Sequence, residues 1–263
     1  MADASSPIGV FDSGVGGLST LGSLIRELPG EDFLFYGDTA HAPYGTRTRE
    51  EILGYVRGVV AYLLSRDVKA LVIACNTATS VAAADLRAEL SLPIIGIEPA
   101  LKPASLLRRN GQILVLATPV TLRLEKFRRL MEHYGEHAVP VPCPGLMDLV
   151  EQEDYPGAER YLRSVFSGFN MDQVDAVVLG CTHYVFLRPM VRELLPERIH
   201  ILDGNEGTAR QLRRVLDARS LLNPRTGGGH VTLETSGNRE QVLPVMERMM
   251  ATSSASRSLG TFP

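Results

Sequence analysis

Two apolar runs that each end in a cysteine constrain the fold of this chain more than any other feature. Residues 70–74 lead into Cys75, and residues 176–180 lead into Cys181. A short run rich in Val, Leu and Ile, followed by small polar residues and helix-forming sequence, is typical of a buried parallel strand that leads into a helix. We therefore expect both thiols at the carboxyl ends of strands, near the N-terminus of the following helix, whose partial positive charge favours the thiolate.

The two cysteines belong to a repeated pattern. The spacing from Asp12 to Cys75 equals the spacing from Thr118 to Cys181, and each earlier residue stands at the end of an apolar run. A further apolar segment follows each cysteine at the same distance, at residues 94–97 and residues 200–203. Open α/β sheets place their chemistry at the carboxyl ends of the strands. The repeat predicts two pseudo-symmetric α/β lobes with mostly parallel sheets and an active site in the cleft between them.

Strand and helix signals alternate along the chain, which favours parallel sheets covered by helices. The strand signals lie at residues 8–11, 32–36, 70–74 and 94–97, and restart at 113–116, 138–141, 177–179 and 199–202. We predict a first lobe made of residues 1–98 plus 207–263, which contains Asp12 and Cys75. The second lobe is predicted over residues 99–206.

The last part of the chain is expected to return to the first lobe. A helix is predicted over residues 208–218 and a strand over residues 231–234. The glycine-rich segment 223–229 is typical of a mobile loop, and we expect residues 251–263 to be poorly ordered.

Composition and charge exclude several classes of protein. A formal charge of −3 gives no electrostatic basis for binding nucleic acid. Three scattered cysteines cannot form a disulfide framework, and the absence of CxxC and HExxH patterns excludes the common metal spacings. Residues 1–6 lack the features of a signal peptide, and apolar stretches such as residues 59–64 are too short to span a bilayer. We expect a cytoplasmic protein with no metal, no nucleic acid and no membrane partner.

A glycine-rich turn follows the first predicted strand. Residues 14–17 (Gly-Val-Gly-Gly) resemble a phosphate-binding loop but match neither GxxxxGK[ST] nor GxGxxG. We interpret the glycines as allowing the backbone to approach a small anion at a helix N-terminus. Asp12 and Ser13 precede this turn, and Asp12 is either a reacting group or a helix cap.

Several side chains near the cysteines could handle protons or bind a carboxylate. His183 follows Cys181 by two residues, and imidazole exchanges a proton near neutral pH. Asp12 could support Cys75 in the same way from the neighbouring strand. Cys143, in a Pro-Cys-Pro-Gly turn, is interpreted as structural. Hydrogen-bond donors for a carboxylate directly follow the two strand-end cysteines: Asn76, Thr77 and Thr182.

Four motifs, in this order, closely resemble the glutamate racemase family of the aspartate/glutamate racemase superfamily. They are Asp-Ser-Gly-Val-Gly-Gly-Leu at 12–18, Pro-Tyr-Gly at 43–45, Cys-Asn-Thr-Ala at 75–78 and Gly-Cys-Thr-His-Tyr at 180–184. Residues 96–100 and the pair Val150-Glu151 are also similar to that family, so the resemblance covers nearly the whole chain. Leu124 and Phe127 depart from the family pattern, in which we expect a serine and a tyrosine.

The resemblance implies an isomerase that interconverts L- and D-glutamate without a cofactor and supplies D-glutamate for peptidoglycan synthesis. It implies that Cys75 deprotonates D-glutamate with help from Asp12, and that Cys181 deprotonates L-glutamate with help from His183. It also implies a homodimer. The substrate-binding residues carried over from the resemblance are Ser13, Tyr44, Gly45, Asn76, Thr77, Thr118, Thr121, Thr182 and Glu151.

Other functions explain less of the sequence. An aspartate racemase or a maleate-type isomerase would keep both cysteines, but the full motif set favours glutamate. A one-thiol decarboxylase of the same superfamily is disfavoured by the second thiol, and a cysteine hydrolase that uses Cys181 and His183 leaves Cys75 unexplained. A non-catalytic binding module differs in a measurable way, because alkylation of its thiols would leave its main activity intact.

Overall fold

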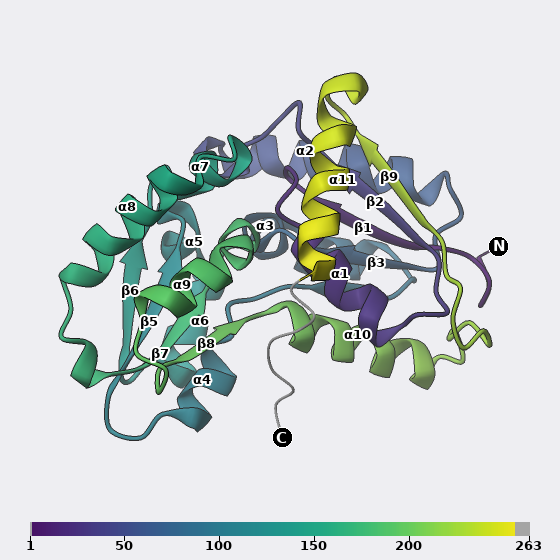
Figure 1. Cartoon of the computed structure of the whole chain (residues 1–263). Helices are drawn as coiled ribbons and strands as arrows, with labels where there is room; N and C mark the ends of the chain where they lie inside the picture. Colours follow the sequence, from purple (N-terminus) through teal and green to yellow (C-terminus); the bar gives the residue numbers. More distant parts are fainter. Residues whose placement is uncertain (1, 256–263) are drawn as a thin grey trace. The chain divides into compact units, whose positions relative to one another are not determined.

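The computed structural model describes residues 2–255 and divides into two compact units. The first unit combines the chain up to Ile97 with the chain from Asn205 onward, and the second unit spans Glu98–Gly204. Figure 1 shows the course of the chain through both units. None of the helices in the described part of the chain has the length and apolar character that a membrane span requires.

The first unit contains a five-stranded parallel sheet with the order β4-β3-β1-β2-β9. Its strands are β1 (Ile8–Asp12), β2 (Phe33–Gly37), β3 (Ala70–Ile73), β4 (Ile94–Gly96) and β9 (Val231–Thr235). Its helices are α1 (Leu18–Glu27), α2 (Arg49–Leu64), α3 (Asn76–Glu89), α10 (Asn205–Ala218), α11 (Arg239–Ala255) and the short 3₁₀ helix η1 (Tyr44–Thr46). Helix α1 packs against α10 and α11, and α2 packs against α3.

The second unit contains a four-stranded parallel sheet with the order β6-β5-β7-β8. Its strands are β5 (Gln112–Ala117), β6 (Ala138–Pro142), β7 (Val174–Leu179) and β8 (His200–Asp203). Its α-helices are α4 (Leu101–Leu107), α5 (Pro119–Arg123), α6 (Glu125–Tyr134), α7 (Leu146–Glu151), α8 (Tyr155–Ser167) and α9 (Arg188–Leu194). Two 3₁₀ helices complete it, η2 (Met171–Gln173) and η3 (Thr182–Leu187).

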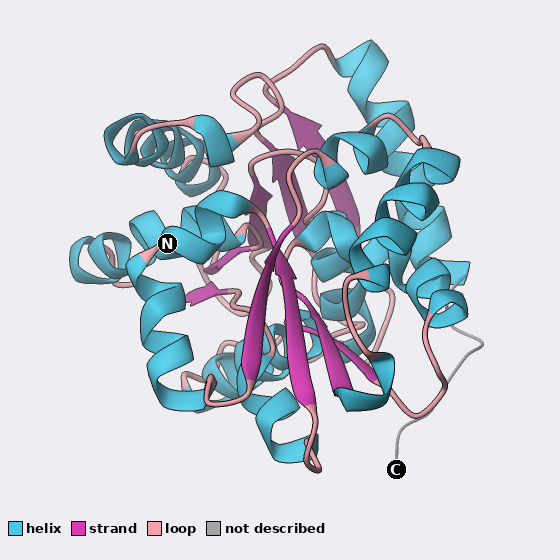
Figure 2. Ribbon diagram, turned by 90° about the vertical axis from the view of Figure 1, so that its left-hand side faces the viewer, coloured by secondary structure: helices cyan, strands magenta, loops and turns pink. Residues whose placement is uncertain are grey.

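The two sheets share one topology. In each unit the first strand lies between the second and the third, and the fourth lies beyond the third. Strand β9 extends only the first sheet. The α/β class with parallel sheets, predicted from the alternation of strands and helices, is therefore confirmed, and Figure 2 shows the strands enclosed by helices.

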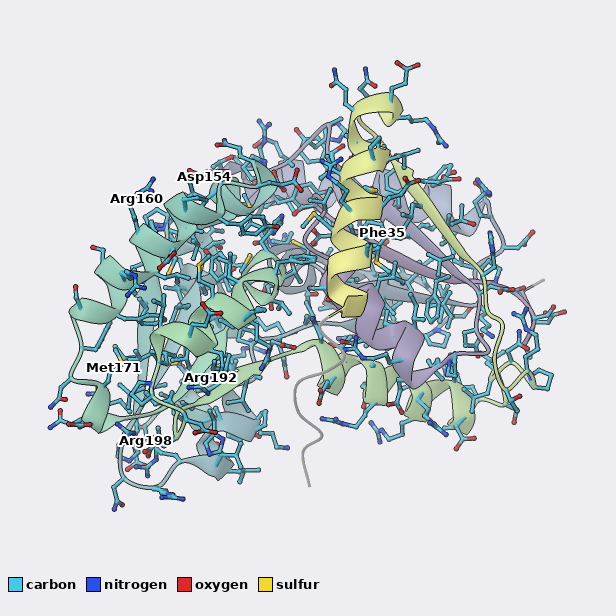
Figure 3. All side chains as sticks on the ribbon, viewed as in Figure 1. Phe35, Asp154, Arg160, Met171, Arg192 and Arg198 are labelled. Carbon is cyan, nitrogen blue, oxygen red and sulfur yellow. The ribbon has the colours of Figure 1, made fainter. Side chains whose placement is uncertain are left out.

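The central strands of each unit are buried on both faces, as a parallel sheet covered by helices requires. All five residues of β1 are buried, and Phe35 of β2 is fully buried in the first unit. Figure 3 labels Phe35 together with Arg192 and Arg198 of the second unit. Arg192 donates a hydrogen bond to the carbonyl of Ile199, directly before β8, and Arg198 donates one to the carbonyl of Val174 in β7. These bonds connect the two strands to their loops.

Helix α11 ends at Ala255, within the segment from residue 251 that we expected to be poorly ordered, and residues 256–263 lie outside the described part. Pro244 lies inside this helix, and a proline normally interrupts a helical pattern. In the segment 223–229, expected to be mobile, Gly229 N donates to Pro29 O at 3.0 Å.

A buried ion pair and its hydrogen bonds join four segments at the amino ends of the strands in the first unit. Lys69 Nζ lies 2.5 Å from Glu31 Oε2, and both side chains are at most 2% exposed. Lys69 also donates to the carbonyl of Ala4, and Glu31 Oε1 accepts from the backbone N–H of Asn223 at 2.8 Å. A buried charge without its partner is strongly destabilising, so each member of the pair depends on the other.

Replacement of Lys69 by methionine should lower the free energy of unfolding by about 3–5 kcal/mol, because it leaves the Glu31 carboxylate buried without a counter-charge. Urea unfolding followed by circular dichroism measures this loss. Arg57→Met is the matched control, since Arg57 and Glu89 form a surface pair, exposed by 52% and 47%, and its loss should cost less than about 1 kcal/mol. Equal changes in the two variants would show that the buried pair has no special role.

Candidate active site

The carboxyl ends of the strands in the first unit bring together polar side chains from three neighbouring strands. Strands β3, β1 and β2 lie side by side, and Cys75, Asp12 and Asp38 stand at or just beyond their ends. Backbone hydrogen bonds keep these ends in line, because Ala74 N donates to Phe11 O at 2.8 Å and Asp38 N donates to Asp12 O at 3.0 Å. The sheet thus places a thiol and two carboxylates next to one another.

Cys75 caps the N-terminus of α3. Its Sγ accepts a hydrogen bond from the backbone N–H of Ala78 at 3.4 Å and contacts Ser13 Oγ at 3.5 Å. The residue is only 7% exposed. A backbone N–H and the positive end of a helix both favour a thiolate at this position.

The turn after β1 folds around the carboxylate of Asp12. Asp12 Oδ2 accepts from Gly14 N at 3.2 Å and from Gly17 N at 3.1 Å, and the residue is 1% exposed. A Cβ on Gly17 would lie 2.6 Å from Asp12 Cβ, so only glycine permits this approach. The glycines therefore let the backbone approach the side chain of Asp12, and a small anion at this turn stays a prediction.

A buried tyrosine belongs to the loop after β2. Tyr44 donates its hydroxyl proton to Asp38 Oδ2 at 2.6 Å, and His41 Nδ1 lies 2.8 Å from Asp38 Oδ1. Burial, and then the hydrogen bond to Asp38, raise the pKa of Tyr44 well above its usual value. Gly45 follows it in η1 and is half-buried. Asp38 is not among the residues predicted from the sequence, although its position at a strand end is the same signal that singled out Asp12.

The first turn of α3 carries two further polar residues that were predicted to bind substrate. Asn76 and Thr77 are 8% and 6% exposed. The Oδ1 atom of Asn76 is buried and has no hydrogen-bond partner among the described residues. A buried polar atom of this kind is costly unless something else bonds it, which is typical of a ligand site.

The strand ends of the second unit repeat the arrangement. Strands β7, β5 and β6 lie side by side, and Cys181, Thr118 and Cys143 follow their ends. Cys181 therefore occupies in its sheet the place that Cys75 occupies in the first sheet. Cys181 is 8% exposed, and Thr182, which follows it, is 4% exposed.

The surroundings of Cys181 differ from those of Cys75. The element after Cys181 is η3, a 3₁₀ helix of six residues, and the Cys181 side chain makes no capping hydrogen bond to it. Cys181 thus lies at the N-terminus of the following helix, as expected, but that helix is a 3₁₀ helix and the side chain does not cap it. The thiol instead contacts an imidazole, with 3.7 Å between Cys181 Sγ and His183 Nδ1.

His183 is held on its other side by a carboxylate. The distance from His183 Nε2 to Glu151 Oε1 is 2.8 Å. Burial acts to lower the pKa of His183, but the bonds to Cys181 and Glu151 outweigh it and raise that pKa well above the usual value. Burial acts to raise the pKa of Glu151, yet the bond to His183 lowers it overall. His183 therefore contacts Cys181 through one ring nitrogen and Glu151 through the other, and its raised pKa favours the charged imidazolium.

Four further residues that the sequence singled out lie in the second unit. Thr118 and Thr121 lie just after β5, and Leu124 and Phe127 lie farther along the chain, at the start of α6 and within it. Thr118 caps α5, accepting from Thr121 N at 3.3 Å, and the two hydroxyls lie 2.9 Å apart. Phe127 is 4% exposed and packs in the core, while Leu124 is half-buried between α5 and α6. The departure from the family pattern at Phe127 therefore lies in the core, and the one at Leu124 lies at the junction of two helices.

Cys143 behaves as a structural residue. It is 1% exposed, and its thiol donates to Val141 O at 3.5 Å. Burial raises its pKa to about 12, so the thiol stays protonated at neutral pH. Its carbonyl accepts from the hydroxyl of Tyr184 at 3.0 Å. Within residues 2–255, no group of three or more His, Cys, Asp or Glu side chains is arranged to hold a metal ion.

Replacement of Glu151 by glutamine should lower the pKa of His183, because the negative charge is lost while burial of the imidazole remains. NMR titration of the histidine ring nitrogens measures the change. Glu159→Gln is the control, since Glu159 is exposed and pairs with Arg163 on α8. An unchanged pKa of His183 would show that Glu151 does not stabilise the imidazolium.

The raised pKa of His183 also makes stability depend on pH. The stabilisation by protonated His183 is complete below its unfolded-state pKa of about 6.5 and is lost as the pH rises through the higher folded-state pKa. The wild-type free energy of unfolding should therefore fall above about pH 6.5 relative to His183→Asn, which lacks the imidazole. Parallel stability curves for the two proteins would contradict this assignment.

Comparison with known proteins agrees with the resemblance seen in the sequence. A sequence model of the family described as Asp/Glu/Hydantoin racemase matches residues 8–212. Glutamate racemase of Clostridium botulinum is 43% identical over 253 residues, which cover 95% of this chain and 98% of that protein.

Solved structures give the same result. Glutamate racemase of Thermus thermophilus, in complex with β-chloro-D-alanine, is 38% identical with a TM-score of 0.82, and the match covers 94% of both chains. The Escherichia coli glutamate racemase, in complex with L-glutamate and the activator UDP-MurNAc-Ala, is 27% identical with a TM-score of 0.80. That match covers 93% of this chain and 95% of the other.

Proposed function

The chain belongs to the Asp/Glu/Hydantoin racemase family, and we propose that it is a glutamate racemase, an isomerase that interconverts L- and D-glutamate without a cofactor. The observation that carries this proposal is the pair of buried thiols at equivalent strand ends, one bonded by a backbone N–H at a helix start and the other in contact with His183. Relatives that match nearly the whole chain are glutamate racemases, which supports glutamate over aspartate as the substrate.

The reaction needs two acid/base groups. Racemisation removes the α-proton from one face of the substrate and delivers a proton to the opposite face. We assign Cys75 and Cys181 to these two faces, with one present as thiolate and the other as thiol in each direction. Because the α-proton of an amino acid is very weakly acidic, hydrogen-bond donors must also stabilise the negative charge that develops in the transition state.

Deprotonation of L-glutamate is assigned to Cys181. The imidazolium of His183 stabilises the Cys181 thiolate, which then accepts the α-proton. Glu151 bonds the far nitrogen of the same ring and keeps it oriented and charged. This contact gives Glu151 a role through His183, in addition to the substrate-binding role that the resemblance implies.

Deprotonation of D-glutamate is assigned to Cys75. The N–H of Ala78 and the N-terminus of α3 favour its thiolate, and Asp12 assists proton transfer from the adjacent strand. The buried Oδ1 of Asn76 suits the α-ammonium group of the substrate. The remaining substrate-binding roles are assigned to Ser13, Tyr44, Gly45, Thr77, Thr118, Thr121 and Thr182.

The cellular role follows from the product. We assign the protein to the cytoplasm, where it supplies D-glutamate for peptidoglycan synthesis, and we propose that it acts as a homodimer. The Escherichia coli relative binds the activator UDP-MurNAc-Ala, a cell-wall precursor, which supports this role. The negative formal charge gives no support for a nucleic-acid partner.

The purified protein should interconvert L- and D-glutamate with no added pyridoxal phosphate, metal or nucleotide, because two thiols and preorganised donors suffice for the chemistry. Circular dichroism and the exchange of the α-proton for deuterium both measure the reaction. Full activity after dialysis against a chelator and treatment with hydroxylamine is the expected result. Loss of activity that pyridoxal phosphate restores would overturn the proposal.

Cys75→Ala and Cys181→Ala should each slow racemisation in both directions by on the order of 10⁴-fold, since every turnover needs both groups. Elimination of chloride from β-chloroglutamate needs only one proton removal. Cys75→Ala should therefore keep elimination from the L-enantiomer, and Cys181→Ala should keep it from the D-enantiomer.

Cys143→Ala is the matched control for these variants, because Cys143 is a buried cysteine in the same unit as Cys181 and has no assigned part in the reaction. It should racemise glutamate at the wild-type rate. If Cys75→Ala and Cys181→Ala processed both enantiomers of β-chloroglutamate equally, the assignment of one thiol to each face would be mistaken.

A further inference from the structure

A chain of buried hydrogen bonds runs from the start of α10 to the carboxylate of Asp12. Asn205 is the first residue of the segment that returns to the first unit, and it is 2% exposed. Its Nδ2 donates to Ser19 Oγ at 3.2 Å, and its Oδ1 accepts from Thr20 Oγ1 at 2.7 Å. Ser19 and Thr20 lie in the first turn of α1 and are also buried.

The hydroxyl of Ser19 continues the chain to the turn after β1. Ser19 Oγ donates to the carbonyl oxygen of Gly16 at 2.9 Å. That carbonyl belongs to the same planar peptide group as the N–H of Gly17, which donates to Asp12 Oδ2 at 3.1 Å. One peptide group is therefore bonded at both ends, to Ser19 through its oxygen and to Asp12 through its nitrogen.

We propose that Asn205 and Ser19 are positioning residues that orient the carboxylate of Asp12 through the Gly16–Gly17 peptide group. The proposal rests on the function proposed above, in which Asp12 assists Cys75. A hydrogen bond at a peptide oxygen polarises the N–H of the same group, so Ser19 strengthens the donor that Asp12 accepts. The bond from Asn205 sets the direction of the Ser19 hydroxyl proton, because Ser19 then donates toward Gly16.

The placement gives these residues no direct part in the chemistry. Asn205 and Ser19 act on Asp12 through one peptide group, and Gly17 must lack a side chain for that group to approach Asp12. Their loss should therefore slow the step at Cys75 and leave the step at Cys181 unaffected. A purely structural role would affect both steps together.

Two variants test the proposal. Ser19→Ala removes the hydroxyl, and Asn205→Asp keeps the shape of the side chain while replacing the donor with an acceptor that competes for the Ser19 proton. Each should slow chloride elimination from D-β-chloroglutamate by roughly 10- to 100-fold, the scale of a small misplacement of a reacting group. Elimination from the L-enantiomer should stay within about twofold of wild type, which is far below that effect.

Ser23→Ala is the matched control, because Ser23 is a buried serine of the same helix whose side chain bonds Arg26. It should leave both eliminations unchanged. The amide proton of Gly17 provides a readout that does not depend on activity. It should exchange with solvent faster, with a shifted NMR signal, in Ser19→Ala and Asn205→Asp but not in Ser23→Ala.

The outcomes separate the positioning role from the proposed function. An unchanged Gly17 amide in both test variants, or equal slowing of both enantiomers, would overturn the positioning role. Absence of racemisation and elimination in the wild-type protein would overturn the proposed function, while the Gly17 amide would still report whether Asn205 and Ser19 act on Asp12.

Discussion

Hydrogen bonding between parallel strands is the constraint on which the candidate site depends. Parallel pairing fixes the register of β3 on β1 and of β7 on β5, so the residues that leave these strands emerge at one edge of each sheet. Cys75 then follows the strand next to that of Asp12, and Cys181 follows the strand next to that of Thr118. The positions of these groups are set by the backbone, before any interaction between their side chains.

The two units share one sheet topology, but the groups that contact their thiols differ. Cys75 is bonded by a backbone N–H at the start of an α-helix, whereas Cys181 contacts an imidazole that a carboxylate holds in place. A fixed helix terminus carries no exchangeable charge, while His183 gains and loses a proton. The two half-reactions of a racemase can therefore have different pH dependence, although the folds around them are equivalent.

Two networks of buried polar groups also hold segments of the first unit in place. The turn after β1 encloses Asp12, and the bonds from Ser19 and Asn205 fix the peptide group that faces it. At the opposite, amino ends of the strands, the ion pair of Lys69 and Glu31 also holds loops in place. Lys69 bonds the carbonyl of Ala4, and Glu31 bonds the N–H of Asn223. Each network is satisfied only in the folded state, because its members come from distant parts of the sequence.

The sequence by itself determined the fold class, the strand ends and the family, because apolar runs and short motifs are local patterns. It also marked Cys75, Cys181, Asp12 and His183 as candidates. Only the tertiary structure decided how these side chains are bonded. The six-residue η3 after Cys181, the carboxylate on the far nitrogen of His183 and the bond from Asn205 to Ser19 were not predictable. The last two are contacts between residues far apart in the chain, and no local pattern records which distant donor meets which acceptor when the sheets form.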